Sequence, residues 1–242
     1  VGDMLIEPAQ AAMPYPTHLP IILDADAAFY SLDPSTWAAR QLSVINSVRV
    51  IYWLFEPWSN NNWSIKLNVV GQETWLPGNG PTTTDQVELI QEINSLEYYM
   101  IKPPANDEIS YYFAGYDLSG GIAGIAYLKG LCDWADYDDT YGDQHWNRAW
   151  GQQVADIDSG YEFSTLYGRM VVAAHEIGHM LGAHHDDGCT GDGCCAVGTL
   201  SFLCGTSLLK SGAAGGVAPD FRQPFFNAPA SEKIKACVDD VY

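Results

Sequence analysis

The fold and the chemistry of this chain are decided by one stretch, His175-Glu-Ile-Gly-His-Met-Leu-Gly-Ala-His-His-Asp186. His175 and His179 stand four residues apart, so on a helix they project from one face and can bring two imidazole nitrogens to one cation. Glu176 lies between them and leans toward the open side of such a metal, where a bound water needs a base. This half of the stretch therefore predicts two metal ligands and a general base.

The second half of the stretch supplies a third ligand. Gly182 can adopt the positive φ that ends a helix, which lets His185 turn back toward the metal. Three imidazoles leave one position for water, the arrangement of a catalytic rather than a structural zinc. The alternative is an ordinary amphipathic helix that happens to contain histidines, but six fixed residues at these offsets should arise by chance at fewer than roughly one in ten million positions.

The extension to Gly182 and His185 resembles the signature of the metzincin zinc endopeptidases. Asp186, directly after the third histidine, is similar to the adamalysin (reprolysin) branch, which holds the ADAM and snake-venom metalloproteinase catalytic domains. The resemblance implies a secreted endopeptidase that binds one Zn²⁺ and hydrolyses peptide bonds of extended protein substrates. The zinc-bound water would attack, and Glu176 would act as the general base.

Hydrophobic periodicity predicts alternating strands and helices. The predicted strands cover residues 19–24, 65–69 and 109–113, and the predicted helices run from Asp33-Pro34 to about Phe55 and over residues 84–100 and 163–181. The pattern indicates an α/β (α+β) fold, a twisted mixed sheet packed by long helices, of which the last is the active-site helix.

The resemblance also implies the domain organisation. A single metalloprotease catalytic domain would span residues 1–242. Residues 1–182 would form the upper subdomain with the sheet and the active-site helix. Residues 183–242 would form a smaller, irregular, disulfide-bonded lower subdomain with the turn beneath the zinc, a pocket wall and a C-terminal helix.

Residues 121–129 resemble the strand that lines the metzincin cleft. An exposed edge with small side chains offers N–H and C=O groups to an extended peptide. The alternative is a glycine-rich strand that is only bulged or tightly packed. Residues 206–217 would form the outer wall of the pocket for the side chain after the cut. The expected substrate-binding residues of the strand are Gly121, Ile122, Ala123, Gly124, Ile125 and Ala126.

The chain departs from the family in two places. Metzincins carry a methionine in the turn beneath the zinc, where this chain has Leu200, an exchange that costs under about 1.5 kcal/mol in cores. Activity is therefore expected, and the alternative is a metzincin-fold zinc protein with little turnover that acts as a binding module. The family's structural calcium would be held here by Asp107 and Asp240, but the first strand lacks the expected glutamate, and isolated aspartates are more often solvated.

The cysteines and the charge bear on location and partners. Six cysteines without a Cys-x-x-Cys pair predict disulfides in an oxidising compartment, with zinc binding by the cluster as the alternative. The resemblance pairs Cys132 with Cys237 and leaves four to pair among themselves in an order that the sequence does not choose. These four are Cys189, Cys194, Cys195 and Cys204.

The formal net charge is −19, from 30 acidic and 11 basic residues. This charge disfavours nucleic acid and anionic lipid as partners. It would suit cationic peptides or cations, or it only keeps the protein soluble. No apolar run is long enough for a membrane span, and no signal segment opens the chain. We expect a processed, soluble monomer that acts on proteins or peptides.

Overall fold

Within the part of the chain that the structure describes, five strands form a sheet at the centre of the fold. The computed structural model describes residues 17–53, 65–76, 78–81, 83–85, 88–93, 108–116, 123–127, 130–132, 148–153, 165–183 and 228–241. The strands are β1 (Thr17–Ala25), β2 (Ile65–Gln72), β3 (Ile109–Ala114), β4 (Gly124–Ala126) and β5 (Arg148–Gln152). Their order in the sheet is β2-β1-β3-β5-β4. β1 pairs in parallel with β2 and β3, and β3 with β5, whereas β4 runs antiparallel to β5. The predicted mixed sheet is confirmed, and β4 is its edge.

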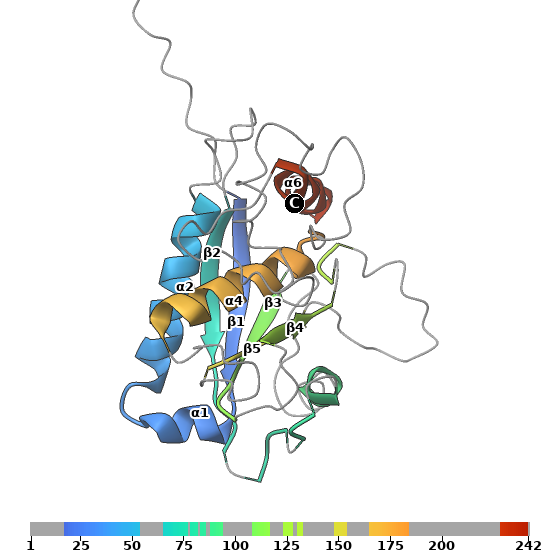
Figure 1. The fold of residues 1–242 in the computed structure, drawn as a ribbon. Helices are drawn as coiled ribbons and strands as arrows, with labels where there is room; N and C mark the ends of the chain where they lie inside the picture. The colour runs from blue at the N-terminus through green and yellow to red at the C-terminus, as the bar shows by residue number, and fades with distance from the viewer. Residues whose placement is uncertain are drawn as a thin grey trace, which may run out of the picture.

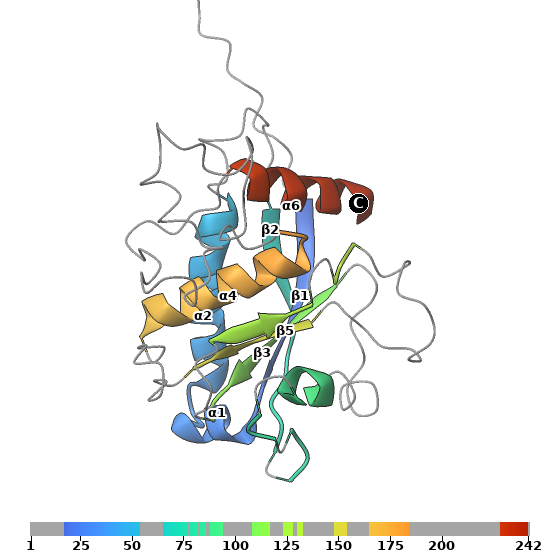
Figure 2. The ribbon, with the colours of Figure 1, turned by 45° about the vertical axis from the view of Figure 1, so that its right-hand side comes forward.

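Long helices cover the sheet. The helices are α1 (Ala27–Leu32), α2 (Trp37–Trp53), α4 (Leu166–Met180) and α6 (Ala228–Val241). Figures 1 and 2 show α2 and α4 against one face of the sheet, with α6 beyond the end at which β1 begins. Residues 88–93, inside the predicted helix 84–100, are helical. Among the described helices, none is both long and apolar enough to cross a membrane.

β3 is buried along its whole length because its side chains alternate between two apolar clusters. Tyr111 and Phe113 belong to the main cluster, to which α2 and α4 also contribute. Tyr112 and Ala114 face the other way and pack with Trp150 of β5 in a second cluster. The centre of the sheet is thus covered on both faces, as parallel strands require.

The first long helix begins later than the sequence predicts. α2 starts at Trp37, whereas Asp33 is the C-cap of α1. The Asp33 carboxylate accepts hydrogen bonds from the hydroxyls of Ser35, at 2.7 Å, and Thr36, at 2.6 Å. These bonds fix a turn, so Pro34 lies in that turn rather than in the first turn of the helix.

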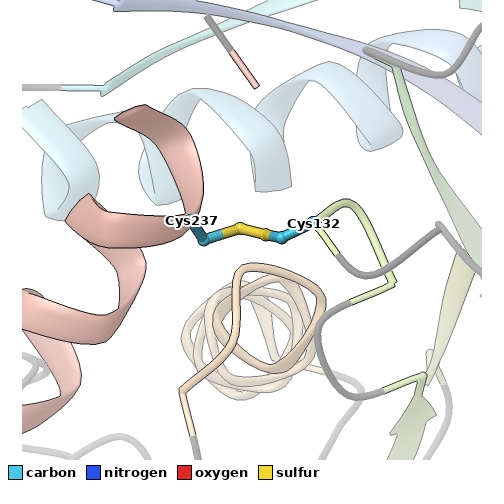
Figure 3. The surroundings of a disulfide bond; sticks show 2 residues. All are labelled: Cys132 and Cys237. Atoms are coloured by element: carbon cyan, nitrogen blue, oxygen red, sulfur yellow. A yellow bond between two sulfur atoms is a disulfide. The ribbon is translucent and has the colours of Figure 1, made fainter. Parts of the chain in front are cut away.

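A disulfide joins α6 to the segment after β4. Cys132 and Cys237, whose Cα atoms are 5.4 Å apart, form this bond across 105 residues of sequence, and Figure 3 shows it. It is the pair that the resemblance implies. Ile234 and Val238 of α6 are buried in the main cluster together with Leu131. The C-terminal helix is therefore part of the same core as the sheet.

Candidate active site

α4 is the helix that carries the first two histidines, and it is held at its start and on its inner face. The Thr165 hydroxyl caps the helix by accepting a hydrogen bond from the backbone N–H of Gly168 at 3.0 Å. Tyr52 of α2 donates its hydroxyl to the carbonyl of Ala174 at 2.9 Å. Buried Ala173, Ala174 and Ile177 fill the main cluster. These contacts fix the rotation of α4 about its own axis, and with it the direction in which its other face points.

The end of α4 follows the prediction for Gly182, whose φ is 90°. The N–H of Gly182 donates to the carbonyl of His179, and the N–H of Ala183 donates to the carbonyl of Gly178, both at 2.9 Å. These two bonds are the Schellman motif, which ends a helix at a left-handed residue. The chain therefore turns back over the last turn of α4 directly before the third expected ligand.

This turn orients His179. Its Nδ1 lies 2.6 Å from the carbonyl oxygen of Ala183. A carbonyl only accepts, so Nδ1 carries the proton and Nε2 carries the lone pair. That Nε2 lies 3.0 Å from Nε2 of His175, and the two rings are perpendicular with centroids 4.6 Å apart. The backbone after Gly182 thus fixes the form of imidazole that can bind a metal.

The two imidazoles fit a zinc ion. Zinc binds histidine nitrogen at about 2.0–2.1 Å in a tetrahedral arrangement, which separates two ligand nitrogens by roughly 3.3 Å. The observed separation of 3.0 Å is close to this value. His175 and His179 are both partly exposed, so the pair is open on one side. Within the described ranges no three His, Cys, Asp or Glu side chains converge, and His185 lies outside those ranges.

Glu176 differs from its histidine neighbours because the residue is only 5% exposed. Burial raises the pKa of this carboxyl group to about 8. A divalent cation on the adjacent histidines would favour the charged form and lower that pKa again. The carboxyl group packs against the edge strand, since a Cβ added to Gly124 would lie 2.8 Å from Glu176 Oε1. The candidate base thus lies between the face of α4 that carries the two histidines and the edge strand β4.

Several predicted site residues fall outside the described part of the chain. Of the expected substrate strand, residues 123–126 are described, with 124–126 forming β4. For Asp240 only the backbone, in α6, is described. The calcium site, the turn beneath the zinc and the other disulfides stay predictions. The residues outside the description are Gly121, Ile122, Asp107, Leu200, Cys189, Cys194, Cys195 and Cys204.

A cavity of about 190 Å³ lies at the carboxyl ends of β1 and β3, where Asp26 and Tyr116 line it. Asp26 is a buried residue that the sequence analysis did not single out. Its Oδ1 accepts from the N–H of Phe29 at 2.6 Å and its Oδ2 from the N–H of Gly115 at 2.8 Å. The carboxylate joins the start of α1 to the loop after β3, so its role is structural. An aspartate directly before a helix is the N-cap signal that could have identified it.

The helix α4 carries two imidazoles and a buried carboxyl group beside an edge strand. This arrangement is found in metal-dependent peptidases. Comparison with family models agrees, because the model of metallo-peptidase family M12, of the reprolysin type, matches residues 16–216. The match covers most of the chain, so the chain belongs to metallo-peptidase family M12. The comparison with curated proteins returned no match.

Proposed function

We propose that this chain is a secreted, zinc-dependent endopeptidase that cleaves extended protein substrates. Family membership supports a metallopeptidase in general. The observation that carries the finer proposal is the pair of Nε2 atoms of His175 and His179, 3.0 Å apart, beside the buried carboxyl group of Glu176. His185, three residues after Gly182, is the third proposed ligand.

The three histidines would hold the zinc ion, which when bound supplies a Lewis acid and makes water more acidic. Glu176 takes a proton from the water molecule that attacks the scissile carbonyl carbon. As the C–N bond breaks, Glu176 gives this proton to the leaving amine nitrogen, so the carboxylate is regenerated. The buried position of Glu176 restricts this exchange to the side that faces the substrate.

The edge strand β4 would hold the substrate. An extended peptide that pairs with residues 123–126 would form a sixth strand, with backbone hydrogen bonds that do not depend on its sequence. Residues 206–217 are proposed as the wall of the pocket beyond the cut. In this arrangement residues 1–182 and 183–242 are the two subdomains, and the turn at Gly182 leads from one to the other.

The disulfide supports the proposed location. Cytosolic thiols are kept reduced, whereas a disulfide such as Cys132–Cys237 persists in an oxidising compartment. The strong negative charge suits a protein that acts on peptides rather than on nucleic acid.

The decisive experiment measures zinc content and proteolysis in the same preparation. Protein purified without chelators should contain about one zinc per chain and cleave an unfolded protein substrate. A chelator should abolish cleavage, and added zinc should restore it. Absence of zinc would refute the site, whereas bound zinc without cleavage would favour the alternative, a metzincin-fold binding module.

A further inference from the structure

Two glycines face each other across the last two strands of the sheet. Gly124 of β4 and Gly151 of β5 are direct partners in the antiparallel ladder. At each glycine, another residue occupies the space that a side chain would fill. A Cβ on Gly151 would overlap the Tyr111 hydroxyl, and a Cβ on Gly124 would lie 2.8 Å from both Cγ and Oε1 of Glu176.

The space beside Gly124 is closed on a second side. The same added Cβ would lie 2.6 Å from the carbonyl oxygen of Trp150, which is backbone and cannot rotate away. Carbon atoms in contact are normally about 3.5–4.0 Å apart. The 2.8 Å from the added Cβ to Glu176 Cγ is far shorter, so a methyl group does not fit unless neighbouring atoms shift. Glycine in a strand weakens it and commonly marks a close approach, here the approach of Glu176.

We propose that Gly124 is a positioning residue for Glu176: the bare backbone of the edge strand fixes where that carboxyl group lies. The inference rests on the proposed function, in which Glu176 transfers the proton. A glutamate has three rotatable side-chain bonds, and contact with β4 restricts them. Because β4 would also align the substrate, Gly124 would determine the position of the Glu176 carboxyl group relative to the bound peptide.

The contact itself is tested by unfolding the metal-free protein, which does not depend on activity. Gly124→Ala is introduced into the wild type, into Glu176→Ala and into Glu176→Gln, and the unfolding midpoints are compared. The drop caused by Gly124→Ala should be smaller beside Glu176→Ala, since Cγ and Oε1 of Glu176 are gone there and the contact with the Trp150 carbonyl oxygen remains. Beside Glu176→Gln, which has the same size, the drop should be unchanged.

Gly151→Ala is the matched control, since it adds the same methyl group to the neighbouring strand. Its drop should be reduced by Tyr111→Phe, which removes the overlapping hydroxyl, and should be unchanged by Glu176→Ala. Equal drops for Gly124→Ala in all three backgrounds would overturn the proposal. If Gly124→Ala alone fails to fold, a folded double variant with Glu176→Ala supports the proposal. A double variant that also fails to fold assigns the need for glycine to the Trp150 carbonyl rather than to Glu176, which overturns the proposal.

The second readout is the kinetics of peptide cleavage by the zinc-loaded protein. A displaced base slows the chemical step, so Gly124→Ala should lower kcat at least tenfold and change KM by less than twofold. A raised KM with unchanged kcat would mean that Gly124 acts on substrate binding, which overturns the positioning role. If the wild type does not cleave, the proposed function fails, while the unfolding comparison still decides whether Gly124 confines Glu176.

Discussion

At the scale of single residues, Glu176 gives the clearest prediction. It is not a proposed ligand, so Glu176→Ala should keep one zinc per chain. Turnover should fall by roughly 10²–10⁴-fold, the usual contribution of a positioned proton carrier. Metal analysis and initial rates on one peptide check both expectations. Glu88→Ala, which removes an exposed carboxyl group elsewhere, is the control. Near-normal turnover in Glu176→Ala would show that another group carries the proton.

Asp26 predicts a dependence of stability on pH. Burial raises its pKa from 3.8 to about 6 against the opposing effect of its backbone hydrogen bonds. The folded chain therefore holds this proton more tightly than the unfolded chain, and the stabilisation is complete below pH 4 and lost as pH rises through 6.

The measurement compares the wild type with Asp26→Asn, which does not titrate, in the presence of a chelator. The difference in their free energies of unfolding should change by about 2–3 kcal/mol between pH 4 and pH 7. The wild type should become less stable relative to Asp26→Asn as pH rises. A difference that is flat across this range would show that Asp26 keeps an ordinary pKa in the folded chain.

At the scale of elements, the N-cap of α4 should contribute to holding the site. Thr165→Ala removes the acceptor for the N–H of Gly168 and should cost about 1 kcal/mol of stability. Thr165→Ser keeps the oxygen and should cost much less. Denaturant unfolding of the two variants tests this expectation. Equal losses would mean that the methyl group of Thr165, rather than its hydroxyl, matters.

The elements also show what local sequence can and cannot predict. β1, β3 and α4 were predicted because burial on one or two faces leaves a pattern within each segment. α1 and β5 were missed, since they are short, and β5 is stabilised by its neighbours β3 and β4 rather than by a pattern of its own. The candidate site shows the same difference between features that follow from local sequence and features that need the folded chain. The spacing of His175, Glu176 and His179 is local, whereas the fit of Gly124 against Glu176 exists only once strand and helix have met.

At the scale of the whole molecule, the disulfide ties the C-terminal helix to the segment that follows the edge strand β4. Closing 105 residues into a loop restricts the unfolded chain, for which the chain-entropy model gives about 4–5 kcal/mol. The double variant Cys132→Ala/Cys237→Ala should therefore unfold at a clearly lower denaturant concentration, with α6 as the element that separates first. Unchanged stability would show that apolar packing of α6 alone holds it in place.

The same bond makes a ring of the chain between residues 132 and 237, and the proposed catalytic motif lies inside that ring. A single backbone cut within it, including one that the protein makes in itself, releases no fragment and only adds the mass of one water. Such a molecule would migrate as one band without reductant and as two bands with it. Preparations that look intact under non-reducing conditions can therefore contain nicked protein, and activity should be related to the uncut fraction seen after reduction.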